Sequence, residues 1–257
     1  MLFDVNCYLG AWPFSLVPEM NAEQLARHLD RAGVDCAAVS PLGAVFQPEP
    51  MPANRALFAA LRGKRRFIPL PVVNPALANW KEQLEECAAA PGVRAVRLYP
   101  NYHDYRLTRR TLLPFVDALE HHRLRLVITA RIEDERHRYF ALRIKGVPVA
   151  DLTAFLKANP RTVPLVTGLS VTEAIQLASG TENFLADISY QENIELAAML
   201  RGKLSSSRLM FGTLTPLVSA AAQSGKLCAP DFSAAERRRI ASTNAVRFFS
   251  GPHADRR

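Results

Sequence analysis

Short apolar runs that alternate with amphipathic stretches are the strongest constraint in this sequence. The runs lie at residues 2–5, 37–40, 67–73, 95–99, 124–129, 163–167, 184–188 and 209–213. Nearly continuous apolar character over about five residues is typical of a parallel strand that is covered on both faces. The sequence therefore predicts eight buried parallel strands. The third run is the weakest of them, because Pro69 and Pro71 each remove a backbone donor from the sheet.

The stretches between the runs carry signals of helix ends. The spacing Ser170-x-x-Glu173 predicts a capping box, and Ser233-x-x-Glu236 repeats it before a last helix whose apolar stripe includes Phe248. Further helices are expected at about 22–32, 53–62, 79–89, 111–122, 148–158, 191–201 and 216–225.

Eight repeats of strand and helix over this length favour an α/β fold, a single (β/α)8 barrel (TIM barrel) with an extra C-terminal helix. A doubly wound open sheet is the alternative, but no glycine-rich phosphate turn follows the first run. No Ser/Gly-rich linker divides the chain. We therefore expect one domain over residues 1–250 and a polar tail over residues 251–257.

The charge and the cysteines limit the partners and the compartment. The chain carries 32 Lys+Arg and 24 Asp+Glu, a formal net charge of +8, but no nucleic-acid-binding motif accompanies the basic clusters. No apolar run approaches the roughly 18 residues of a membrane span, and residues 1–7 lack the pattern of a secretory signal. The four cysteines are scattered, which favours free thiols. We expect a cytoplasmic protein with no nucleic-acid or membrane partner, and a homo-oligomer stays open.

The active site of such a barrel lies at the carboxyl ends of the strands. Strand alternation predicts that Phe3 and Val5 face the helices, and that Asp4, Asn6 and Tyr8 point inward. The same alternation places residues 97 and 99 of the fourth strand in the barrel mouth.

Polar residues at these strand ends are the candidate site. The candidates for acid–base catalysis are Tyr99, His103, Glu133 and Asp187, and those for substrate binding are Asn6, Tyr8, Arg97, Asn101 and Arg131. Two inward guanidinium groups could clamp a carboxylate or phosphate bidentately. In the alternative interpretation, Arg97 and Arg131 form an internal ion-pair network with Glu133 and Asp187.

Several motifs carry a family resemblance, among them Gly33-Val-Asp and Val39-Ser-Pro after the first predicted helix. The segment Phe3-Asp-Val-Asn-Cys-Tyr-Leu-Gly resembles the first-strand motif of the amidohydrolase superfamily, in its amidohydrolase-2 branch. Met210-Phe-Gly-Thr-Leu-Thr-Pro is similar to the eighth-strand motif of that branch, and Asn244-Ala-Val-Arg-Phe-Phe is similar to its C-terminal helix. The resemblance covers essentially the whole chain. It implies a (β/α)8 barrel and a hydrolase that holds a divalent metal.

The resemblance also implies ligand positions that this sequence fills differently. The family's His-x-His is Asn6-Cys7-Tyr8 here, and the Asp expected on the eighth strand is Leu214. The histidines expected to end strands five and six correspond to Thr129 or Ala130, and to Thr167 or its neighbour. Asn and Thr are poor ligands for a zinc-type ion, and Leu is none. We therefore expect no metal and no other cofactor.

Three functions remain open. The first is a metal-independent, amidohydrolase-related barrel that binds a small carboxylated or otherwise anionic molecule, and hydrolyses or otherwise transforms it by acid–base chemistry. The second is a catalytically inactive barrel (a pseudoenzyme) that acts as a binding or structural protein, which a filled barrel mouth would favour. The third is a metallohydrolase with relocated ligands, for example Glu133 with His137.

Overall fold

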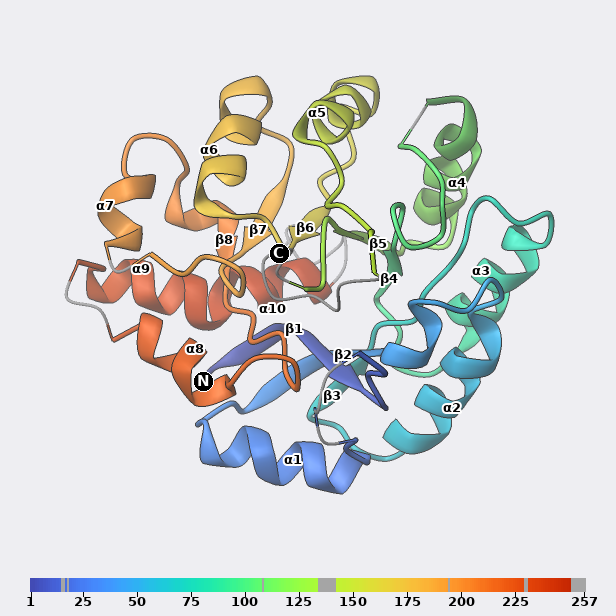
Figure 1. The fold of residues 1–257 in the computed structure, drawn as a ribbon, viewed down its shortest axis with the longest axis horizontal. Coiled ribbons are helices and arrows are strands. Elements are labelled where there is room, and N and C mark those ends of the chain that lie inside the picture. The colour runs from blue at the N-terminus through green and yellow to red at the C-terminus, as the bar shows by residue number, and fades with distance from the viewer. Residues whose placement is uncertain are drawn as a thin grey trace.

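Eight parallel strands surround the centre of the fold, in chain order (Figure 1). The computed structural model describes residues 1–14, 17, 19–107, 109–133, 142–193, 195–228 and 231–250, so the expected tail at 251–257 lies outside the described residues. The strands are β1 (Phe3–Leu9), β2 (Cys36–Pro41), β3 (Phe67–Pro69), β4 (Ala95–Leu98), β5 (Arg125–Thr129), β6 (Leu165–Thr167), β7 (Leu185–Asp187) and β8 (Leu209–Met210).

Three sets of contacts close the strands into a barrel. Strands β1–β3 and β4–β8 form two hydrogen-bonded groups, and a parallel bridge between Val72 and Arg97 joins them. On the other side, the Val5 amide donates to the Phe211 carbonyl at 3.0 Å, and the Tyr8 amide donates to the Thr215 carbonyl at 2.8 Å. The predicted (β/α)8 barrel is therefore confirmed. The strand β3 ends at Pro69, as expected where prolines remove ladder donors.

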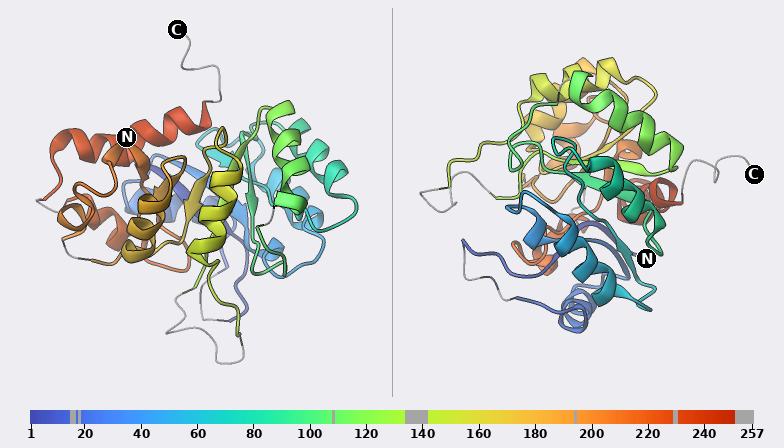
Figure 2. Two further views of the ribbon diagram at one scale, coloured as in Figure 1. Left: turned by 90° about the horizontal axis from the view of Figure 1, so that it is seen from above. Right: turned by 90° about the vertical axis from the view of Figure 1, so that its right-hand side faces the viewer.

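Except for the last one, the helices cover the outside of the barrel, as the three views show (Figures 1 and 2). They are α1 (Ala22–Arg31), α2 (Met51–Leu61), α3 (Trp80–Ala89), α4 (Arg109–His121), α5 (Val149–Ala158), α6 (Val171–Gly180), α7 (Leu196–Leu200), α8 (Ala220–Lys226), α9 (Ala234–Arg238) and α10 (Asn244–Phe249), with a π-helical turn at Arg239–Thr243. Both predicted capping boxes, at Ser170 and Ser233, are present. None of the described helices is long and apolar enough to cross a membrane.

The helix α10 fills the amino-terminal opening of the barrel (Figure 1). Its Phe249 ring stacks on the Phe3 ring with centroids 5.4 Å apart, and Phe248 joins the same buried cluster. Phe3 and Val5 therefore point into the barrel, and Asp4 between them points away from it. This corrects the predictions that Phe3 and Val5 face the helices and that Asp4 points inward.

A register shift in β1 explains the correction. The shift lies between Asp4 and Cys7, where the Asn6 amide donates to Asp4 Oδ1 at 2.9 Å. Such a bulge changes which residues face inward. Beyond it Asn6 and Tyr8 point into the barrel, as predicted, and they lie at the carboxyl end where the site is expected.

Candidate functional site

Arg97 is the largest fully buried side chain of the structure, and β4 carries it into the barrel interior. Its Nη1 donates to Asn6 Oδ1 at 2.9 Å and to the Tyr8 hydroxyl, and its guanidinium carbon lies 4.7 Å from the centroid of the Tyr8 ring. Its Nε and Nη2 have no hydrogen-bond partner among the described residues. One edge of this buried cation therefore makes no hydrogen bond of good geometry, which is costly, although the Tyr99 hydroxyl lies close to the guanidinium.

Asn6 links Arg97 to Asp187. Its Nδ2 donates to Asp187 Oδ2 at 3.0 Å and to Ser189 Oγ at 3.1 Å, while its Oδ1 accepts from Arg97. Asp187 also accepts from the Ser189 hydroxyl and, at 3.0 Å, from the Gly168 amide. Burial raises the pKa of Asp187, and these hydrogen bonds, together with the charge of Arg97, offset part of that rise. The two charges thus interact through the Asn6 amide, and not through the direct ion pair that the sequence suggested.

Tyr99 lies beside Arg97, and the His103 ring packs against the Tyr99 ring with centroids 5.8 Å apart. The buried Tyr99 hydroxyl makes no hydrogen bond of good geometry with a described residue, although Arg97, Tyr8 and Ser40 surround it. Burial raises the pKa of Tyr99. His103 Nε2 lies 2.9 Å from the Ala44 carbonyl, so Nε2 carries the proton and Nδ1 keeps its lone pair. Burial lowers the pKa of His103, which favours this neutral form.

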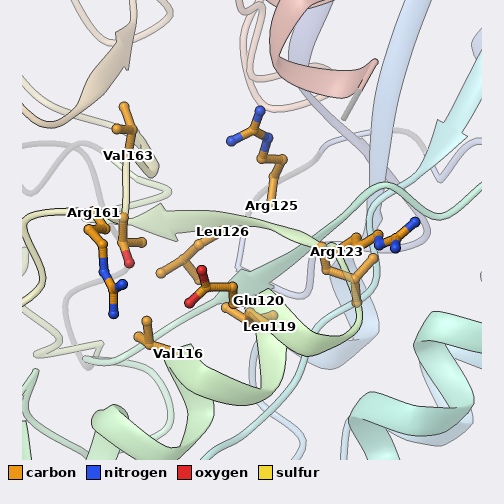
Figure 3. Close-up of a pocket in the computed structure, with 10 residues that line it drawn as sticks. Val116, Leu119, Glu120, Arg123, Arg125, Leu126, Arg161 and Val163 are labelled. Atoms are coloured by element: carbon orange, nitrogen blue, oxygen red, sulfur yellow. The ribbon is translucent and has the colours of Figure 1, made fainter. Parts of the chain in front are cut away.

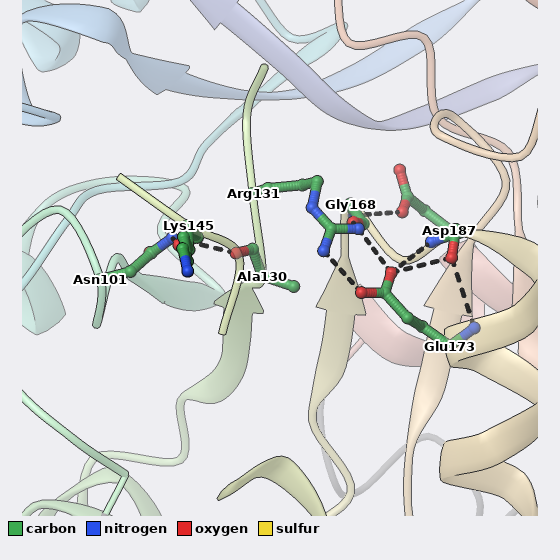
Figure 4. A network of polar contacts seen from close by, with 8 residues as sticks. Asn101, Ala130, Arg131, Lys145, Gly168, Glu173 and Asp187 are labelled. Carbon is green, nitrogen blue, oxygen red and sulfur yellow. Dashed lines mark hydrogen bonds and ion pairs between the residues drawn. The ribbon is translucent and has the colours of Figure 1, made fainter. Parts of the chain in front are cut away.

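Arg131 pairs with Glu173, for which the sequence predicts only a helix-capping role (Figure 4). Its two terminal nitrogens each lie 2.5 Å from a carboxylate oxygen of Glu173, and its guanidinium lies 5.2 Å from the centroid of the Tyr190 ring. Glu173 also closes the capping box with Ser170. The predicted pairing of Arg131 with Glu133 or Asp187 therefore differs from the structure, and the capping motif gave no sign of this second role.

Asn101 and Glu133 lie at the rim and hold loops together. Asn101 Nδ2 donates to the carbonyls of Ala130, at 3.1 Å, and Lys145, at 2.6 Å. Glu133 Oε1 accepts from the Trp12 indole at 2.5 Å. The structure thus brings Asn6, Tyr8, Arg97, Tyr99, His103 and Asp187 together, and leaves Asn101, Arg131 and Glu133 outside that group.

An aromatic layer, made of Trp12, Phe14, Phe46 and Tyr102, packs over the interior. The Trp12 and Phe46 centroids are 5.2 Å apart, and those of Phe46 and Tyr102 are 5.5 Å apart. The Tyr102 ring in turn packs edge-on against the Tyr99 ring, with centroids 6.1 Å apart. The mouth is filled, because the side chains of Asn6, Tyr8, Arg97, Tyr99 and Asp187 have no exposed surface.

A second buried carboxylate lies next to this group. Asp4 Oδ1 accepts from the backbone amides of Asn6 and Thr213, and Oδ2 accepts from the Thr213 hydroxyl at 2.5 Å. No cation pairs with it in the described part of the chain. Burial raises the pKa of Asp4 to about 6, and the nearby Asp187 charge adds to this rise.

The donor groups at this place do not fit a divalent metal. Asn6 Oδ1 already accepts from a guanidinium, whose charge would repel a second cation. Thr129 and Thr167 hydrogen-bond each other at 3.0 Å. Within the described ranges, no three His, Cys, Asp or Glu side chains are grouped so that they could hold a metal ion. His137, part of the relocated pair considered above, lies outside the described residues.

A cavity of about 200 Å3 lies at the opposite end of the barrel, beside the start of β5 (Figure 3). Val116 and Leu126 form part of its apolar wall, and Glu120 and Arg161 flank it. Since it opens at the amino-terminal ends of the strands, it is separate from the Arg97 group.

Solved structures with the same fold include enzymes that act on aromatic acids. The 5-carboxyvanillate decarboxylase from Novosphingobium aromaticivorans, complexed with manganese and a nitrobenzoic acid, is 15% identical, with a TM-score of 0.78 over 97% of this chain and 96% of that one. The 2,6-dihydroxybenzoate decarboxylase from Rhizobium is 13% identical, with a TM-score of 0.73 over 97% and 98% of the two chains. At these identities the likeness shows the fold alone.

A probable 2-pyrone-4,6-dicarboxylic acid hydrolase from Acinetobacter baumannii, with citric acid bound, has a TM-score of 0.68 at 13% identity, over 97% of this chain and 99% of that one. No curated protein matches the sequence. A family model described as amidohydrolase (Amidohydro_2) matches residues 12–251, which is most of the chain. The chain therefore belongs to this amidohydrolase family.

Proposed function

We propose that the protein binds a small aromatic carboxylate inside the barrel, with the carboxylate on the free edge of Arg97. The observation that carries the proposal is the unpaired Nε and Nη2 of this fully buried guanidinium. Buried polar groups in proteins are almost always hydrogen-bonded, and a charged one that is not suggests a missing partner.

Two other arginines of this protein bind carboxylates through the edge formed by Nε and Nη2. Arg55 donates from Nε and Nη2 to the two carboxylate oxygens of Glu86, at 2.6 and 2.7 Å. Arg106 binds Asp151 in the same way, at 3.1 and 2.8 Å. Two parallel N–H groups match the spacing of two carboxylate oxygens, so the free edge of Arg97 is suited to a carboxylate.

The aromatic layer supplies a surface for the rest of the ligand. Trp12, Phe46 and Tyr102 would face a ring whose carboxylate reaches Arg97, provided that the layer moves aside for entry. The structural relatives named above act on carboxylated rings, which supports an aromatic acid as the first class to test.

We further propose that any chemistry at this site is acid–base chemistry of the protein's own groups. His103 Nδ1 has a free lone pair and can take a proton, and the Tyr99 hydroxyl can donate one. Asp187, whose pKa burial raises, can hold a proton close to Asn6 and Ser189. The residues at the ligand positions that the family resemblance implies, such as Asn6 and Leu214, are poor metal ligands, which favours a reaction that does not route through a metal.

Calorimetric titration with benzoate and with benzamide tests the proposal. The two have the same shape, but benzamide carries no charge. We expect benzoate to bind and benzamide not to bind, and Arg97→Lys, which lacks the fork, to weaken benzoate binding at least about 30-fold. Arg106→Met, which removes an exposed arginine, is the matched control. Equal binding of the two compounds, or unchanged binding by Arg97→Lys, would contradict the proposal.

The catalytically inactive barrel is the second candidate, and the filled mouth favours it. Incubation of the protein with benzoate, 2,6-dihydroxybenzoate and their esters, followed by chromatography, separates the two functions. Binding without any product supports the second. Metal analysis of the purified protein tests the relocated-ligand hypothesis, because a bound stoichiometric transition metal would be required.

A further inference from the structure

Lys226, the last residue of α8, reaches from outside the barrel to the end of β7. Its Nζ donates to the carbonyl oxygens of Ile188, at 3.0 Å, and Ser189, at 3.3 Å. These two residues directly follow Asp187, the last residue of β7. One ammonium group therefore holds two consecutive peptide carbonyls at the carboxyl end of the strand.

The held segment is part of the Arg97 group. The Ser189 hydroxyl donates to Asp187 Oδ2 and accepts from Asn6 Nδ2, and Asn6 in turn accepts from Arg97. A continuous chain of polar contacts thus runs from Lys226 to Arg97. A change in the Ser189 backbone would move the hydroxyl that fixes Asp187.

We propose that Lys226 is a positioning residue of the Arg97 site, which fixes the Ser189 hydroxyl and the Asp187 carboxylate through the Ile188–Ser189 backbone. The inference rests on the proposed function, because it takes this group of residues to be a ligand site.

The position of the ammonium is unfavourable for a purely structural lysine. Lysine side chains are mostly exposed and keep the ammonium in water, whereas Lys226 is half-buried and its ammonium binds two carbonyl oxygens. Asp187 and Glu192 are the charged groups that face it, and both favour its protonated form. Burial outweighs them and lowers the pKa of Lys226 to about 8. Such costly groups are concentrated at functional sites.

The variants Lys226→Arg and Lys226→Met test the inference, with Lys203→Met as the control at an exposed lysine. An arginine keeps its charge at all pH values used, whereas methionine never carries one. The first measurement is the dissociation constant of benzoate between about pH 6.5 and pH 9.5. We expect the wild type to lose about tenfold in affinity above pH 8. Lys226→Arg should stay constant, and Lys226→Met should bind about tenfold more weakly throughout.

A second measurement needs no ligand. Carboxyl 13C resonances report the ionisation of Asp187 in each folded variant. We expect Asp187 to ionise at a higher pH in Lys226→Met than in the wild type, because a facing cation is lost.

Absence of benzoate binding by the wild type would refute the proposed function alone. The positioning role is overturned if Lys226→Met matches the wild type in the Asp187 titration, or if Lys226→Arg loses benzoate affinity near pH 8 as the wild type does. If Lys226→Met does not fold, Lys226→Arg and the wild-type titration decide.

Discussion

Replacement of Asp4 by asparagine should make the protein more stable at neutral pH and change how its stability depends on pH. The carboxyl group has an ordinary pKa of 3.8 and, in the folded protein, a pKa of about 6. The folded state therefore holds the proton more tightly than the unfolded chain does. As the pH rises through this interval, the unfolded chain loses the proton first, and stability falls. The two pKa values correspond to a loss of about 3 kcal/mol in the free energy of unfolding, complete above about pH 6.

Asparagine resembles the protonated acid at this place. Its Oδ1 can accept from the amides of Asn6 and Thr213, and its Nδ2 can face the Thr213 hydroxyl, which is free to donate to Thr215 instead. Urea unfolding of both proteins at several pH values between about 4 and 8 measures the effect. The difference in unfolding free energy should be small near pH 4 and reach about 3 kcal/mol in favour of Asp4→Asn at pH 7. Two parallel pH profiles would refute the reasoning, because they would mean that Asp4 titrates alike in both states.

Two further predictions concern the packing around the site. A Cβ atom at Gly212 would lie 2.6 Å from Asp187 Oδ2, so Gly212→Ala should lower the free energy of unfolding by about 1 to 3 kcal/mol and weaken benzoate binding. Gly225→Ala, where no neighbouring atom lies within 4 Å, is the control and should stabilise the helix by about 0.5 to 1 kcal/mol in a thermal unfolding assay. In a Trp80→Phe background Trp12 is the only tryptophan left, and benzoate entry past the aromatic layer should change its emission. Unchanged emission at saturating benzoate would mean that the layer does not open for this ligand.

The fold could be predicted because parallel strands that are covered on both faces appear in the sequence as short, nearly continuous apolar runs. The run at 124–129 became β5 with a shift of one residue at its start, and the capping box at Ser170 marked the start of α6. The ends of short strands were predicted less accurately. The run at 209–213, for example, contains a strand of only two residues, Leu209–Met210. Alternation also placed Arg97 correctly but failed for Phe3, because a bulge shifts the pattern without a sequence signal.

The partners of the site residues could not be predicted to the same extent. Direction along a strand is a local property, whereas the choice of a partner depends on loops and on distant helices. Arg131 was expected in the interior, but Glu173 at the first turn of α6 binds it. Lys226 was missed altogether, because nothing near it in the sequence relates it to Asp187.

The C-terminal helix bears on how this protein can be made in the cell. Phe248 and Phe249 seal one opening of the barrel, and β1 bonds to the segment after β8. The apolar side chains of β1 are therefore covered only after residues 244–249 have been synthesised and have folded onto them. During synthesis, residues such as Phe3 would stay uncovered until the ribosome has released residues 244–249, so aggregation and chaperone binding should be concentrated in nascent chains that stop short of that segment.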